Sequence, residues 1–178
     1  MRKIILYTAA SLNGLIAGRD GDVTWLDLIP NPNNDDYGYN KFLKSIDTTI
    51  QGYNTYHQII GWDIEFPYKG KKNYVLTNRE DIADTESVVF IKENHLDFIR
   101  NLKGTVGPDI WLIGGGTTNT FLFNNNLIDE VRLFIMPIVL NEGIGLFENM
   151  PETTKLMRTG LTEYESGVVE IIYSVDQK

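Results

Sequence analysis

Residues 109–118 read DIWLIGGGTT, a short apolar run that ends in three consecutive glycines. The β-branched and aromatic residues predict a buried strand over 109–113, and the residues after the glycines have apolar positions at helical spacing. Glycines between a strand and a helix let backbone N–H groups approach an anion, because no side chain stands in the way. We therefore expect a ligand site at Gly114, Gly115 and Gly116, with a tight turn that requires positive φ as the alternative.

The glycine run lacks the spacing of two common nucleotide-binding motifs. The dinucleotide fingerprint G-x-G-x-x-G fails because Asn119 stands where its last glycine would be. The phosphate-binding pattern G-K-[ST] occurs nowhere in the chain. The sequence therefore disfavours both a Rossmann domain and a P-loop nucleotide hydrolase.

Strand and helix patterns alternate along the chain, which is typical of a mixed α/β domain. Pro137 falls within one long strand pattern and requires an edge position or a bulge, and Ser166 with Gly167 is typical of a two-residue hairpin turn. We expect one domain over 1–178. The predicted strands are 3–10, 48–51, 73–77, 88–91, 109–113, 130–140, 161–165 and 168–175, and the predicted helices are 35–46, 53–60, 94–104 and one that starts at the glycines.

The composition excludes several classes of protein. The chain has 24 acidic and 16 basic side chains and a formal net charge of −8, which argues against nucleic acid or anionic lipid as a partner. No apolar stretch approaches the roughly 18 residues of a spanning helix, and no signal-peptide pattern follows Met1. The absence of cysteine excludes a disulfide scaffold, a thiolate metal site and a cysteine nucleophile. We expect a cytoplasmic protein, and the two histidines, at 57 and 95, predict no metal site.

Glycine, hydroxyl and amide residues also follow three other predicted strands. They are S-L-N-G at 11–14, G-Y-N-T-Y at 52–56 and T-N-R at 77–79. Thr55 could bind a phosphate or cap its own helix, and Arg79 could pair with a phosphate or be a solvated charge. Since ligands of open α/β sheets bind at the carboxyl ends of the strands, four such sites predict one cleft.

Taken in order, these stretches resemble the dihydrofolate reductase superfamily, most closely the branch that shares the C-terminal reductase domain of the bacterial riboflavin deaminase-reductase. The resemblance covers nearly the entire chain and implies a three-layer α/β fold. In that fold a central mixed, mostly parallel sheet has helices on both faces and ends in a C-terminal antiparallel hairpin. The motifs are S-L-[DN]-G-x-I-A at 11–17, G-x-x-T-Y at 52–56, V-L-T at 75–77, I-G-G-G at 113–116, L-I-D-E at 127–130 and P-x-x-L-x-x-G-x-x-L-F at 137–147.

The resemblance implies that NADPH binds in an extended pose along the sheet edge. In the family the paired glycines are often joined by a cis peptide bond, which would here join Gly114 to Gly115. The positions that match the family's cofactor contacts are Ala9, Ala10 and Ile16 beside the nicotinamide, Gly114, Gly115, Gly116, Thr117 and Thr118 beside its ribose and the pyrophosphate, Gly52, Asn54 and Thr55 beside the pyrophosphate, and Thr77, Asn78 and Arg79 beside the adenosine.

The reaction implied by the resemblance is hydride transfer to a C=N or C=O of a small heterocyclic substrate, of the type of 5-amino-6-(5-phosphoribosylamino)uracil. Asp36 is in register with the family carboxylate that faces the substrate, with Asp35 as its neighbour and a helix-cap role as its alternative. Ser11 and Trp25 are candidate substrate-binding residues, and core packing is the alternative for Trp25.

The chain departs from the family pattern at three places. Tyr53 stands where many members have an arginine that pairs with the 2′-phosphate of the cofactor, so Arg79 would supply that charge. Tyr7 replaces a lysine, and residues 56–60 replace an acidic D-D-P stretch, both typical of the riboflavin enzymes. Dihydrofolate reduction and a non-catalytic nucleotide-binding module on the same fold are therefore the alternative functions.

The resemblance also implies an oligomeric state. The apolar segment 133–140 lies on strands that related proteins use for two-fold pairing. We therefore expect a homodimer.

Overall fold

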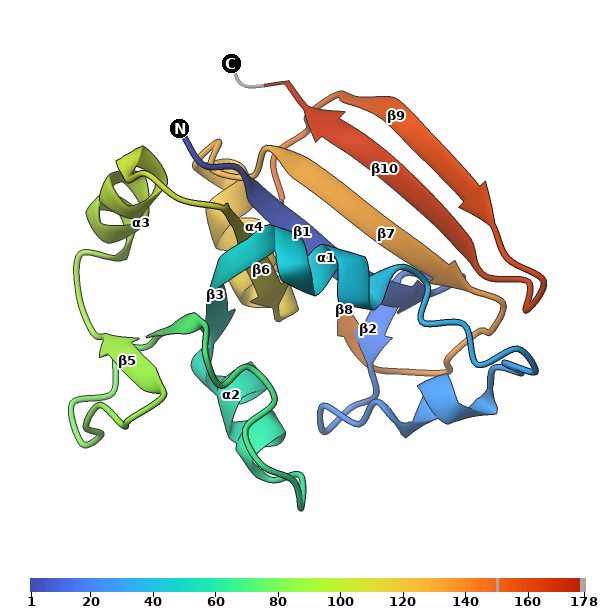
Figure 1. Ribbon diagram of the computed structural model, residues 1–178, viewed down its shortest axis with the longest axis horizontal. Helices are drawn as coiled ribbons and strands as arrows, with labels where there is room; N and C mark the ends of the chain where they lie inside the picture. The colour runs from blue at the N-terminus through green and yellow to red at the C-terminus, as the bar shows by residue number, and fades with distance from the viewer. Residues whose placement is uncertain (150, 177–178) are drawn as a thin grey trace.

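The computed structural model describes residues 1–149 and 151–176. An eight-stranded sheet in the order β5-β4-β3-β6-β1-β7-β10-β9 forms its centre, and β2 and β8 form a separate small ribbon (Figure 1). The strands are β1 (Ile4–Ser11), β2 (Leu15–Ala17), β3 (Ile46–Gly52), β4 (Lys72–Leu76), β5 (Val88–Ile91), β6 (Asp109–Gly114), β7 (Glu130–Met136), β8 (Ile144–Gly145), β9 (Leu156–Glu163) and β10 (Val169–Val175). The helices are α1 (Tyr39–Ser45), α2 (Tyr53–Ile60), α3 (His95–Gly104), α4 (Gly116–Asn124) and a 3-10 helix, Thr24–Leu28.

The sheet is mixed and mostly parallel, as the resemblance implies. Every strand pair from β5 to β7 is parallel, while β10 is antiparallel to both β7 and β9. Because parallel strands are joined by crossovers that cover the sheet, their residues form cores on both faces. The expected α/β architecture with a C-terminal antiparallel hairpin is therefore confirmed.

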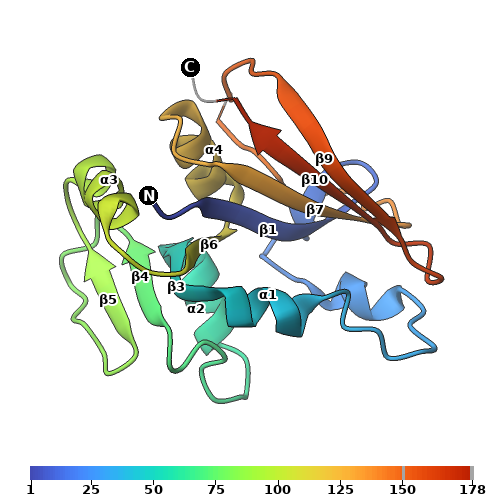
Figure 2. The ribbon, with the colours of Figure 1, turned by 45° about the horizontal axis from the view of Figure 1, so that its top comes forward.

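The helices cover the two faces of the sheet in pairs. Ile99 of α3 and Leu122 of α4 pack in one core with Ile4 and Leu6 of β1. Phe42 of α1 packs with α2 and with the opposite face of β1 in a second core. Figure 2 shows the three layers, with α1 and α2 on one side of the strands and α3 and α4 on the other.

Several predicted bounds were wrong. The strand predicted over 161–165 is part of β9, which begins five residues earlier and spans Leu156–Glu163. The helix predicted over 35–46 begins only at Tyr39, because Tyr37 and Gly38 have φ values of 51° and 78°, which no helix continues through. The strand predicted over 130–140 ends at Met136, because Pro137 has no N–H to give to the ladder. The final hairpin has a three-residue loop: the N–H of Tyr164 donates to the carbonyl of Val168, and Gly167 takes the left-handed position.

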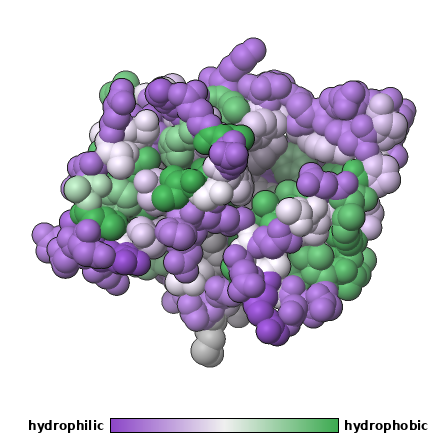
Figure 3. Space-filling view, turned by 90° about the horizontal axis from the view of Figure 1, so that it is seen from below, coloured by the Kyte–Doolittle hydropathy of each residue, from purple (hydrophilic) through white to green (hydrophobic). Residues whose placement is uncertain are grey.

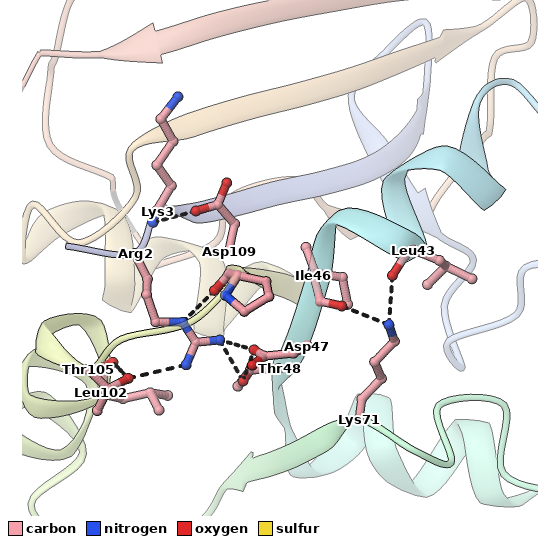
Figure 4. Close-up of polar contacts among 11 residues, drawn as sticks. Arg2, Lys3, Leu43, Ile46, Asp47, Thr48, Lys71, Leu102, Thr105 and Asp109 are labelled. Carbon is pink, nitrogen blue, oxygen red and sulfur yellow. Dashed lines mark hydrogen bonds and ion pairs between the residues drawn. The ribbon is translucent and has the colours of Figure 1, made fainter.

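One buried and one half-buried cation, Arg2 and Lys71, bind polar groups near the amino-terminal ends of the strands (Figure 4). The guanidinium of Arg2, only 4% exposed, donates to Thr48 Oγ1 at 2.7 Å, to the carbonyl of Pro108 and to the carboxylate of Asp47. Lys71 Nζ donates to two carbonyls where α1 ends and β3 begins. A buried charge needs partners of this kind, so the contacts of Arg2 stabilise the fold. They lie at the amino-terminal ends of the strands, away from the carboxyl ends.

Candidate functional site

A cavity of about 750 Å³ opens at the carboxyl ends of β3, β4 and β6. Figure 3 views the molecule from the side toward which β3 runs, and most of that face is hydrophilic with apolar groups between. The volume falls within the usual range for small-molecule sites. The cavity is lined by Arg19, Asp20, Gly21, Gly52, Tyr53, Asn54, Thr55, His57, Gln58, Leu76, Thr77, Asn78, Arg79, Gly115, Gly116, Thr117, Thr118, Ile144 and Glu148.

The structure thus brings three of the four predicted motifs into one cavity. They are the G-x-x-T-Y segment, T-N-R at 77–79 and the glycine run with its threonines. The fourth, at 11–17, runs from the last residue of β1 through a turn into β2 and does not line the cavity. Among the predicted nicotinamide contacts, Ala10 is buried while Ala9 and Ile16 are half-buried on these two strands, and their role stays a prediction.

The starts of α2 and α4 meet at the cavity wall. A Cβ on Gly52 would lie 2.5 Å from Thr118 Oγ1, so only glycine permits this contact. In the described chain, neither helix has a side-chain hydrogen bond at its N-cap, which is Gly52 for α2 and Gly115 for α4. The first N–H groups of a helix have no partner within the helix, and the helix dipole is positive at this end. The starts of both helices therefore place backbone donors at the wall of the same cavity.

The three glycines of the run meet different surroundings. Gly114 has a φ of 122°, and its peptide bond to Gly115 is cis, as the resemblance implies. A Cβ on Gly115 would have only Thr55 Oγ1 within reach, at 3.4 Å. On Gly116 it would collide with the carbonyl of Gly145 and lie 2.7 Å from Glu148 Cγ. The third glycine is therefore required by packing against β8, which the sequence interpretation did not foresee.

An aromatic ring and an ion pair lie together at the cavity edge. The Arg79 guanidinium carbon lies 4.8 Å from the centre of the Tyr53 ring. Nε and Nη2 of Arg79 donate to the two carboxylate oxygens of Asp81 at 3.2 and 3.0 Å. Hydrogen bonds from Arg79 are the main reason that the pKa of Asp81 is below its ordinary value, and Asp81 raises the pKa of Arg79. Both side chains are therefore charged at neutral pH.

Sequence reasoning missed the residues that line the cavity from loops. The loop after β2 supplies Arg19 and Gly21, and Gln58 Nε2 of α2 donates to the carbonyl of Gly21, so this loop is joined to α2. Thr117 Oγ1 donates to Glu148 Oε2 at 3.3 Å. Gln58 lies one helical turn after Asn54, and that spacing could have identified it. No local pattern marks the loop residues, because their places depend on tertiary contacts.

Asp36 lies just before α1 and does not line the described cavity. Its carboxylate accepts hydrogen bonds from the N–H groups of Gly38 and Asn40, at 2.9 and 3.1 Å, and from Asn40 Nδ2 at 2.7 Å. The backbone hydrogen bond from Asn40, followed by that from Gly38, lowers the pKa of Asp36. The structure therefore gives Asp36 a capping role at the start of α1, and its catalytic role stays a prediction.

The two predicted substrate residues are buried. Trp25 is 5% exposed and packs with Phe134, Met136 and Val168, and its Nε1 has no hydrogen-bond partner among the described residues. Ser11 Oγ donates to Asn13 Oδ1 at 2.8 Å and accepts from the N–H of Leu15, so it organises the turn after β1. Contact of either with a substrate stays a prediction.

An aromatic cluster lies beside α1. The Tyr7 ring of β1 stacks on Phe42 at 4.1 Å between centroids and lies 4.9 Å from that of Phe134. Burial, with a further contribution from the carboxylate of Glu170, raises the pKa of Tyr7, which is therefore neutral at physiological pH. Tyr7 thus gives this position a neutral aromatic side chain, and the guanidinium of Arg132 lies 5.8 Å from the centre of the neighbouring Phe42 ring.

Residues 1–149 and 151–176 contain no group of three or more His, Asp or Glu side chains arranged to hold a metal ion. No helix within the same ranges has both the length and the apolar character to cross a membrane.

Comparison with known proteins gives one family and several relatives. The family described as RibD C-terminal domain matches residues 2–170. The uncharacterized protein YwjB of Bacillus subtilis is 36% identical over 94% of this chain and 95% of its own length. A crystal structure from Shewanella sp. PV-4, named as a riboflavin biosynthesis protein, is 28% identical with a TM-score of 0.85 and 99% of each chain covered. Dihydrofolate reductase from Enterococcus faecalis, solved with NADP(H), shares the fold with a TM-score of 0.70 at 17% identity, over 98% of this chain and 96% of its own.

Proposed function

Because the chain belongs to the family of the RibD C-terminal domain, we propose that it is a reductase that uses NADPH to reduce a small heterocyclic substrate. The observation that carries the proposal is the meeting of two helix starts without side-chain caps at one cavity, in the described part of the chain. A pyrophosphate is an anion of the size and charge that such backbone donors bind. NADPH, when bound, would supply the hydride for a C=N or C=O bond.

The residues that fit the cofactor divide into three groups. Gly52, Asn54, Thr55 and the run from Gly114 to Thr118 would hold the pyrophosphate and the adjoining ribose through backbone N–H and hydroxyl groups. Thr77, Asn78 and Arg79 would hold the adenosine. Ala9, Ala10 and Ile16 would border the nicotinamide at the β1–β2 turn, where small and apolar side chains exclude water from a reacting face.

Asp36 is our candidate for the group that orients the substrate. Its hydrogen bonds keep the carboxylate ionised, and a negative charge stabilises the positive charge that develops on a protonated imine. Ser11 and Trp25 would contact the substrate from the β1–β2 turn and from the 3-10 helix. The substrate we propose is of the type of 5-amino-6-(5-phosphoribosylamino)uracil, and the family and the name of the Shewanella protein support this class.

We also propose that the protein is a homodimer and that it acts in the cytoplasm. The structural support for a dimer is a row of apolar side chains that crosses three strands in register: Leu133 of β7, Ile171 of β10 and Leu161 of β9. Leu161 is 50% exposed, and Leu133 and Ile171 are half-buried. A second copy would cover this row.

The proposed function is tested by titrating the purified protein with NADPH and then with NADH. The quenching of fluorescence from Trp25, Trp62 and Trp111 reports binding. We expect saturable binding, tighter for NADPH. Turnover is then measured with pyrimidine and pterin substrates, and absence of binding of both dinucleotides would overturn the proposal.

A further inference from the structure

The cluster of Tyr53, Arg79 and Asp81 at the cavity edge pairs a cation with an anion where the proposed cofactor's adenosine would lie. We propose that Asp81 limits the preference of this chain for NADPH over NADH. By accepting two hydrogen bonds from Arg79, Asp81 competes with the 2′-phosphate of NADPH and so lowers the ratio of the two affinities. This inference rests on the proposed function. It adds a residue that lies outside the motifs and does not line the cavity.

The geometry of Arg79 shows why Asp81 competes with a phosphate. A guanidinium binds a carboxylate or a phosphate best through two parallel N–H donors. In Arg79 the donors Nε and Nη2 both go to Asp81, and one face of the guanidinium lies over Tyr53. A 2′-phosphate can use that two-donor edge only after Asp81 has left it.

The charges favour the same conclusion. The Arg79–Asp81 pair has a net charge of zero, so it offers little attraction to a phosphate dianion. Lys92 donates from Nζ to the backbone carbonyl of Glu80 at 3.1 Å, and its positive charge also acts on Asp81. Asp81 therefore lowers the affinity for NADPH relative to NADH without reversing the order of the two affinities.

The size of the effect follows from exposure. The side chains of Arg79 and Asp81 are 51% and 66% exposed, and pairs of this kind are weakened by solvent and salt. We therefore expect a moderate change in the NADPH-to-NADH affinity ratio, about threefold to fivefold, at low ionic strength.

The test compares the full-length protein with Asp81→Asn and Glu80→Gln. Each variant removes one negative charge from the same exposed loop, but among the described residues the Glu80 side chain makes no hydrogen bond or ion pair with Arg79. Dissociation constants are measured for NADPH and NADH, and for adenosine 2′,5′-bisphosphate and 5′-AMP, which isolate the adenosine end. We expect Asp81→Asn to raise the NADPH-to-NADH affinity ratio about threefold to fivefold, and Glu80→Gln to change it less than about twofold.

A double-mutant cycle tests whether Asp81 changes the affinity ratio through Arg79. In an Arg79→Gln background, Asp81→Asn should no longer raise the ratio, because the two side chains act as a pair. A ratio unchanged by Asp81→Asn, with both dinucleotides still bound, would overturn the role of Asp81 and leave the proposed function standing. Absence of binding of all four probes by the unmutated protein would overturn both.

Discussion

Gly115 and Gly116 are neighbours in the chain, but a side chain at each would meet different surroundings. Because only Thr55 Oγ1 lies near a Cβ at Gly115, we expect Gly115→Val to fold as the unmutated protein does. Its methyl groups would project where the cofactor backbone is proposed to lie, so NADPH affinity should fall at least tenfold. Fluorescence titration measures the affinity, and unchanged affinity in a folded variant would remove Gly115 from the site.

Gly116→Ala should instead lower the free energy of unfolding. The new methyl group would collide with the carbonyl of Gly145, a backbone atom that cannot rotate away. Overpacking of this kind costs about 1–3 kcal/mol of the free energy of unfolding. Urea unfolding measures the change, and Gly115→Ala is the matched control. Equal stability of the two alanine variants would contradict the close contact between α4 and β8.

At the scale of elements, the start of α1 makes stability depend on pH. The pKa of Asp36 is lowered by hydrogen bonds that form only in the folded chain. The carboxylate therefore contributes stability above the pKa that it has when unfolded, and this contribution is lost as pH falls through the lower, folded pKa. We expect Asp36→Asn to lower the melting temperature at pH 6 and to have a smaller effect near pH 2. An equal effect at both pH values would show that the charge is not involved.

The same element shows what the sequence predicts and what it does not. The apolar spacing of Phe42 and its neighbours correctly indicated a helix, but its start was missed because Tyr37, a bulky non-glycine residue, takes a positive φ. Glycine and hydroxyl motifs after the predicted strands correctly identified most of the residues that line the cavity. This was possible because the carboxyl ends of parallel strands lie on the same side of the sheet. The contributions of Arg19 and Glu148 depend on how separate loops pack, and no local pattern encodes them.

At the scale of the whole molecule, the proposed dimer depends on the apolar row across β7, β10 and β9. We expect Leu161→Lys to yield monomers, because a charge in the centre of a buried apolar contact has no partner. Light scattering at micromolar concentration measures the mass, and Thr159→Lys on the same exposed strand is the control. A monomeric mass for the unmutated protein would contradict the dimer.

The contact between Gly52 and Thr118 Oγ1 also shapes the thermodynamics of binding. The starts of α2 and α4 are packed together before any ligand arrives, so their donors need no rearrangement to meet an anion. A preorganised site loses little conformational entropy when it is filled, and more of the interaction energy is expressed as affinity. Calorimetry of pyrophosphate binding should therefore give a small unfavourable entropy for this end of the cavity.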